Sequence, residues 1–122
     1  MSIKTRLTIT GVALFMTFPA LAHHGWNGNG NQQFELTGTV EKAVSLSGPH
    51  AEMEIRVDDQ IWEVTLAPPA RTSRAGLREE TIPVGAQVTV SGHRNEDPGR
   101  YEIKTERVTY DHRTYNVYPD RE

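Results

Sequence analysis

The chain contains no cysteine. Its absence excludes a disulfide framework, a thiolate zinc site, a cysteine nucleophile and lipid attachment through cysteine. Long apolar runs are also missing, because the stretch from Leu7 to Phe18 is shorter than the roughly 18 residues that a bilayer anchor needs. We therefore expect no membrane span in the mature protein.

Basic residues are fewer than acidic residues. The 13 Lys and Arg residues are outnumbered by 16 Asp and Glu residues, which gives a formal net charge of -3 with histidine neutral. Charges of both signs are scattered, whereas a nucleic-acid binder needs clustered basic side chains that displace counterions. We expect no nucleic-acid partner.

Motifs of common enzyme classes are missing too. The glycines at positions 25, 28 and 30 precede any predicted strand and open no helix, so they do not form a phosphate-binding loop. No Gly-x-Ser-x-Gly nucleophile turn occurs. A small barrel filled by its own side chains leaves little room for a catalytic cleft. We therefore expect a protein that is not an enzyme.

The first residues have the features of an export signal. Lys4 and Arg6 precede the short apolar stretch, and Ala20 and Ala22 are the small residues that a signal peptidase recognises. We predict a signal peptide over residues 1–22 and a periplasmic or secreted protein. Cleavage would leave about 100 residues, enough for one small domain, and would lower the formal charge from -3 to -5 by removing two basic residues.

The mature chain starts with a Gly- and Asn-rich segment and continues with alternating apolar and polar residues. Residues 23–33 have the composition of a flexible tether. The period-two pattern then predicts strands and one short helix. We expect strands over residues 34–41, 51–57, 61–66, 84–91 and 100–110, and a weak helix over 70–80. We expect the side chains of Val84 and Tyr101 to point into the barrel.

The last predicted strand changes phase. Tyr101 and Ile103 point inward in its first half, but Val108 and Tyr110 follow the opposite alternation, so a bulge near residues 105–107 is expected. Three strands, a helix and two strands predict an all-β protein with one short helix. We expect a five-stranded barrel of the oligonucleotide/oligosaccharide-binding (OB) type over residues 34–112. An open β-sandwich fragment is the alternative.

Residues 113–122 form the predicted C-terminal tail, which can add a short edge strand. Several segments along the mature chain resemble a family of small exported bacterial proteins catalogued only as a domain of unknown function. They are His23-His24-Gly25-Trp26, Leu36-Thr37-Gly38-Thr39-Val40, Gly48-Pro49-His50-Ala51, Leu66-Ala67-Pro68-Pro69, Gly76-Leu77-Arg78 and Pro83 to Gly92. The resemblance implies an exported OB-like barrel and no particular activity.

A more distant likeness connects the chain to periplasmic copper chaperones built on an OB barrel. It rests on Thr37-Gly38-Thr39-Val40 and on the mixture of His, Met and Trp residues. Those chaperones place Met and His ligands on barrel strands around a Trp. Here Met53, the only methionine after the leader, falls on the predicted core face.

Cleavage after Ala22 would make His23 the first residue. Its α-amine and ring nitrogen can then chelate a metal, and His24 offers a second ring; amine and imidazole nitrogens suit Cu(II) better than zinc. A further ligand is needed, and His50 is the predicted one because it follows Gly48-Pro49 and should face outward. Trp26 could shield the ion or dock the tether on an apolar patch.

Simpler interpretations stay open for each histidine. His23 and His24 can belong to a solvated N-terminus, and His50 to an ordinary loop. His93 lies near Glu96 and Asp97, and we expect a solvated turn there rather than a metal site.

Two functions remain. One is an exported metal-binding protein that sequesters or transfers copper through His23, His24 and His50, and that can also engage a periplasmic protein partner. The other is a non-catalytic OB-type module that binds a peptide, a glycan or an envelope protein. Its second and third strands would present Glu52, Glu54, Arg56 and Glu63 to the ligand, and Arg56 is expected to pair with one of these glutamates.

Overall fold

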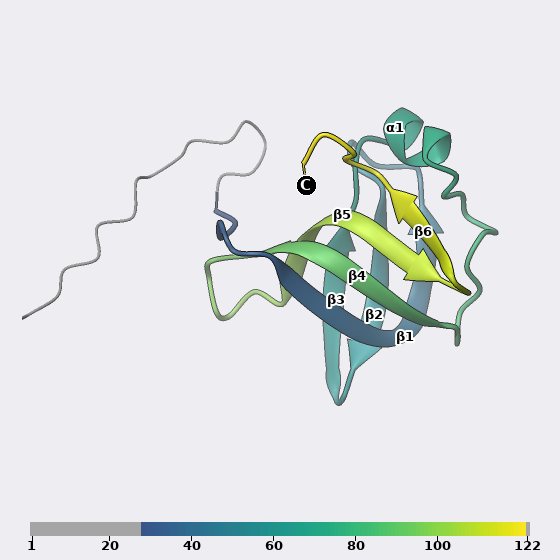
Figure 1. Cartoon of the computed structure of the whole chain (residues 1–122). Coiled ribbons are helices and arrows are strands. Elements are labelled where there is room, and N and C mark those ends of the chain that lie inside the picture. The colour runs from purple at the N-terminus through teal and green to yellow at the C-terminus, as the bar shows by residue number, and fades with distance from the viewer. Residues whose placement is uncertain (1–27, 122) are drawn as a thin grey trace, which may run out of the picture.

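The structure is a computed structural model that describes residues 28–121 (Figure 1). The predicted signal peptide, His23, His24 and Trp26 lie outside these residues. The elements are β1 (Phe34–Ser45), β2 (Glu52–Val57), β3 (Gln60–Thr65), α1 (Pro69–Arg74), β4 (Gln87–Arg94), β5 (Glu102–Tyr110) and β6 (Arg113–Asn116).

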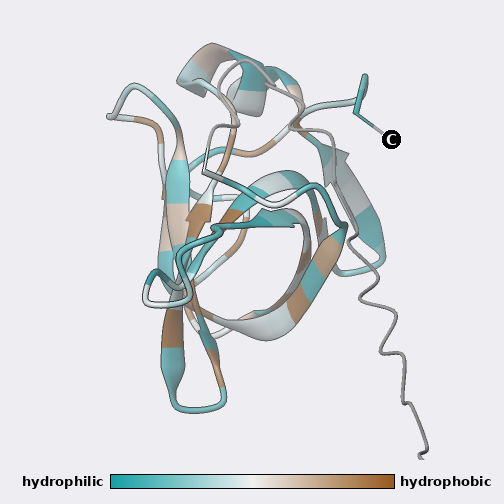
Figure 2. Cartoon of the chain, turned by 90° about the vertical axis from the view of Figure 1, so that its left-hand side faces the viewer, coloured by the Kyte–Doolittle hydropathy of each residue, from teal (hydrophilic) through white to brown (hydrophobic). Residues whose placement is uncertain are grey.

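Five strands close into a barrel. The hydrogen-bonded order is β3-β2-β1-β4-β5, and β3 also pairs with β5 in parallel, which joins the two ends of the sheet. Figure 2 looks into the resulting ring. Closure leaves no open edge among these five strands. The predicted all-β barrel with one short helix is confirmed, and β6 extends the sheet beyond β5.

Alternating apolar residues fill the barrel, as the period-two pattern predicts. The fully buried side chains include Val40, Met53, Ile55, Val64, Leu66, Val88, Val90, Ile103 and Val108. Burying a side chain of this size contributes roughly 1.5–3 kcal/mol relative to leaving it exposed. Met53 is 1% exposed, so the only methionine after the leader packs in the core.

The phase change in β5 is a bulge. Ser91 of β4 pairs with Arg107, whereas the next residue, Gly92, pairs with Thr105, so Glu106 is the extra residue on β5. The bulge predicted for residues 105–107 is confirmed. It turns the Glu106 side chain into a buried position, where it is 1% exposed.

Several element boundaries differ from the prediction. The helix ends at Arg74 rather than at residue 80, because Gly76 adopts a left-handed φ of +103° that stops it. The inward assignment of Val84 and Tyr101 is wrong, since they are 64% and 42% exposed. Gly85, at φ +92°, makes a turn that delays the start of β4.

The predicted tail begins with a hairpin. Asp111 and His112 have φ values of +50° and +62°, the left-handed conformation that a type I′ turn requires at both central residues. Tyr110 therefore pairs with Arg113, and β6 forms the predicted edge strand. Within residues 28–121, no helix is long and apolar enough to cross a bilayer.

Replacing Gly92 by alanine should destabilise the barrel. An added Cβ would collide with the backbone of Lys104 and Thr105 on β5. We expect a loss of roughly 1–3 kcal/mol in the free energy of unfolding, typical of overpacking, measured by denaturant unfolding. Gly30→Ala is the control, because its Cβ would approach only the Arg94 carbonyl, at 3.7 Å. Equal midpoints for the two variants would contradict the predicted clash.

Candidate functional site

His50 lies in the loop between β1 and β2 and is partly buried. Burial lowers its pKa, and the charge of Lys104 lowers the pKa further, while Glu52 acts in the opposite direction. These effects favour a neutral imidazole, which is the form that binds a metal. The neutral form of His50 is therefore favoured over the charged form.

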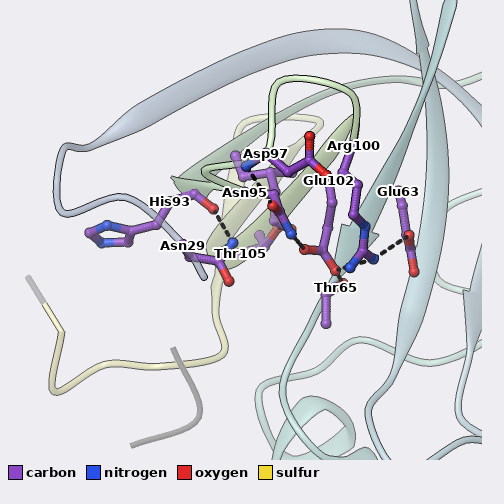
Figure 3. Close-up of polar contacts among 10 residues, drawn as sticks. Asn29, Glu63, Thr65, His93, Asn95, Asp97, Arg100, Glu102 and Thr105 are labelled. Carbon is purple, nitrogen blue, oxygen red and sulfur yellow. Dashed lines mark hydrogen bonds and ion pairs between the residues drawn. The ribbon is translucent and has the colours of Figure 1, made fainter. Parts of the chain in front are cut away.

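Residues 28–30 dock at the end of β4. The Gly30 amide donates to the Arg94 carbonyl at 2.8 Å, and the Glu96 amide donates to the Gly28 carbonyl at 2.7 Å. The Asn29 side chain donates to the carbonyl of His93 at 3.1 Å (Figure 3). The last part of the predicted tether is therefore hydrogen-bonded to the barrel.

A buried polar cluster lies next to this docked segment. The His93 Nε2 and Glu106 Oε1 atoms are 3.1 Å apart, and His93 Nδ1 is 2.5 Å from the Gly30 carbonyl oxygen. The Gln33 amide donates to Glu106 Oε1 at 2.6 Å. Arg121 Nε lies 3.9 Å from Glu106 Oε2. Both ends of the described chain meet at this cluster.

The prediction of a solvated turn at His93 is wrong. His93 is 8% exposed and belongs to β4, which continues past Gly92 through Arg94. The bulge brings the Glu106 carboxylate to its ring. The expected phase change in β5 was the signal that could have revealed this cluster, because a bulge redirects a side chain.

Lys104 connects the cluster to His50. It is 5% exposed and pairs in register with His93, and its Nζ lies 5.8 Å from the centre of the Tyr118 ring. Burial lowers the pKa of Lys104. Its charge lowers the pKa of His50.

An aromatic cluster surrounds Arg94. The guanidinium lies 4.9 Å from the Trp62 ring, 5.6 Å from Tyr101 and 6.0 Å from Phe34. A groove of about 490 Å³ adjoins it, lined by Gly30, Asn31, Gln32, Gln33, Phe34, Arg94, Asn95 and Glu96. Cation–ring contacts of this kind hold an arginine in place.

Acidic side chains line a second groove of about 280 Å³ on β2 and β3. Glu54 pairs directly with Glu63 across these strands, and Glu63 pairs with Glu102 of β5. Arg100 Nη2 is 3.9 Å from Glu63 Oε2 and 3.8 Å from Glu102 Oε2. Tyr101 also lines the groove. Like charges face one another here, and Arg100 and Lys42 are the cations beside them.

Arg56 does not pair with these glutamates, contrary to the prediction. Its Nη2 lies 3.1 Å from Glu41 Oε1 on β1. The pairing of β1 with β2 skips Glu41, because Val40 pairs with Ile55 and Lys42 with Glu54. This irregularity makes Glu41 the neighbour of Arg56.

The two polar regions lie on different sides of the β4–β5 end. In Figure 3 the His93 ring points away from the group formed by Glu102, Arg100 and Glu63. Among residues 28–121, no group of three or more His, Asp or Glu side chains is arranged to hold a metal ion. Of the predicted ligands, only His50 lies in this part of the chain.

The fold and its surface define a small OB-like barrel with a docked N-terminal segment and two open grooves. The chain belongs to a family described as a family of unknown function (DUF6152), whose model matches residues 12–103. No match is found among curated proteins. The predicted membership of a family without an assigned activity is thereby confirmed.

Replacing Glu63 by glutamine should stabilise the protein at neutral pH. Burial and then the charges of Glu102 and Glu52 raise the pKa of Glu63. A carboxyl group with a higher pKa in the folded state opposes folding when it is ionised, and this penalty fades as pH falls through that folded pKa. We expect a higher thermal midpoint at pH 7 and a difference that narrows towards about pH 4.

Glu35→Gln is the matched control for this experiment, because Glu35 is an exposed carboxylate on β1. Its midpoint should stay close to that of the unchanged protein. A destabilised Glu63→Gln variant at neutral pH would show that the ion pair with Arg100 outweighs the repulsion.

Proposed function

We propose that the protein is an exported metal-binding protein that binds copper through its mature N-terminus, for sequestration or transfer. His23 supplies its α-amine and ring, His24 a second imidazole, and His50 the ligand from the barrel. The observation that carries the proposal is the docking of residues 28–30 beside His93, which fixes where the N-terminal segment leaves the barrel.

The reach of this segment supports the proposal. His24 is four residues before Gly28, so an extended chain places it within about 14 Å of that anchor. The charge of Lys104, which pairs in register with His93, lowers the pKa of His50. The proposed site requires that His23 and His24 reach His50 from this anchor.

The donor chemistry favours copper over zinc. Amine and imidazole nitrogens bind Cu(II) tightly, and the site has neither a thiolate nor an available thioether. The lowered pKa of His50 reduces competition from protons at neutral pH. Trp26, two residues before Gly28, is placed in the sequence to shield the ion.

Copper binding should depend on a free N-terminus at His23. Titration of Cu(II) into protein that begins at His23 should give an affinity at least about tenfold higher than in protein with an added N-terminal Met or acetyl group, which corresponds to about 1.4 kcal/mol. His50→Ala should weaken binding as well. His112→Asn is the matched control, because His112 is exposed in the β5–β6 turn and asparagine tolerates its left-handed φ. Equal affinities for free and blocked termini would refute the chelate.

A second candidate function rests on the acidic groove of β2 and β3. OB barrels commonly bind ligands on this face, and here Glu52, Glu54 and Glu63 line the groove with Tyr101. Their mutual repulsion and the aromatic ring suit a basic peptide. In this function the barrel is a binding module that needs no metal.

A lysine-rich peptide is the probe for the second function. Calorimetry should show binding that weakens at high salt, because the attraction is between exposed charges. The double variant Glu54→Gln, Glu63→Gln should lose at least about tenfold in affinity, whereas Glu35→Gln and a chelator should have no effect. Undiminished binding by the double variant would exclude this groove.

A further inference from the structure

The ring of His93 faces two hydrogen-bond acceptors. Its Nδ1 is 2.5 Å from the Gly30 carbonyl oxygen, and its Nε2 is 3.1 Å from Glu106 Oε1. A backbone carbonyl can only accept, and so can an ionised carboxylate. Both contacts are therefore hydrogen bonds only when both ring nitrogens carry a proton.

Hydrogen-bond donors and a cation surround the Glu106 carboxyl group. Gln33 donates an N–H to Oε1 at 2.6 Å, and the Arg121 guanidinium lies 3.9 Å from Oε2. Donors and a cation around a carboxylate stabilise its charge. When both ring contacts are hydrogen bonds, the ring is an imidazolium and Glu106 is the carboxylate that accepts from it.

A neutral ring cannot keep both contacts. It has one N–H and one lone pair, and the lone pair would face either the Gly30 carbonyl or the Glu106 carboxylate. Glu106 is held on the other side as well, because its carbonyl accepts from the amides of Val117 at 2.9 Å and Tyr118 at 3.3 Å. Glu106 is part of β5, which pairs with both β4 and β6, whereas Gly30 lies outside the strands beside an isolated bridge between Asn29 and Asn95. We therefore expect the Gly30 side to give way.

We infer that His93 is a proton-dependent clamp that ties the N-terminal segment, through Gly30, to the Glu106 bulge, and that loss of the ring proton loosens the segment. In relation to the metal site, which rests on the proposed function, His93 is a positioning residue. It holds the anchor from which His23 and His24 extend, and it is not itself a ligand.

Charged side chains near the His93 ring come from β5 and from the C-terminal segment. From β5, the Glu106 carboxylate favours the imidazolium. Lys104, which pairs in register with His93, opposes it. From the C-terminal segment, Arg121 opposes it at longer range by way of Glu106. From residues 28–33, the Gly30 carbonyl contacts the ring, and the Asn29 amide donates to the backbone carbonyl of His93. Of the groups named here, Glu106 is the anion in direct contact with the ring.

The clamp is tested by NMR on the mature protein without metal, from about pH 5 to about pH 8, the range in which histidine changes charge. Ring nitrogen shifts report the protonation of His93. Amide protection factors of Gly30 and Glu96, whose N–H groups form the docking bonds, report docking. We expect their protection to fall about tenfold or more as the ring loses its proton, because hydrogen bonds to charged groups are among the stronger ones.

Val90 is the internal control, because its amide lies in the buried middle of β4 and its protection factor should not follow the ring. The variants His93→Gln and Glu106→Gln should each abolish the pH dependence at Gly30. Unchanged core amides would show that a variant is still folded. Protection at Gly30 that stays constant while His93 titrates would overturn the inference, and so would a ring that is neutral throughout the range.

A Cu(II) titration separates this inference from the proposed function. If the Gly30 protection follows the His93 ring but the protein binds no copper, the clamp stands and the proposed metal site fails. If copper binds and His93→Gln leaves its affinity unchanged, His93 does not position the site. A loss of copper affinity together with the loss of pH-dependent docking supports both.

Discussion

The extra residue in β5 is the local feature on which the arrangement around both chain ends depends. By inserting Glu106 between two paired positions, the strand changes which residues face the barrel interior. A carboxylate is thereby enclosed and must be compensated, since an unpaired buried charge is very costly. His93, Gln33 and Arg121 provide that compensation. They come from β4 and from the two terminal segments, so enclosing one charge brings both termini together.

This arrangement separates the two candidate functions in space. The N-terminal segment is held on the side of Glu106 and Lys104, whereas the acidic groove lies on β2 and β3 with its cross-strand pair of glutamates. In the first region His93 and Arg121 compensate the charge of Glu106, whereas in the second Glu54 and Glu63 face each other across the strands. A ligand bound at one of these regions leaves the other region free. The two candidate functions therefore do not exclude each other.

The barrel and its bulge could be predicted from the sequence because each rests on a local rule. Period-two alternation specifies which side of a strand is buried, and the change of phase between Ile103 and Val108 requires an additional residue. The polar cluster could not be predicted, because a glycine such as Gly92 is typical of a strand end. In the structure β4 continues past it and includes His93. The partner of Arg56 was missed for a related reason, since it depends on an irregular register at Glu41. The sequence also contains no simple pattern that marks Tyr101 as exposed.

The parallel seam between β3 and β5 has a consequence for folding kinetics. It joins residues that are far apart in the sequence, such as Thr65 and Lys104, and contacts of high sequence separation slow the search for the native topology. The chain between these residues has to be ordered, at a cost in conformational entropy, before the seam contributes any stabilisation. The anchor for Gly28 to Gly30 forms on the chain just before that seam, at His93 to Glu96. We therefore expect residues 28–30 to dock only after the end of β4 has formed.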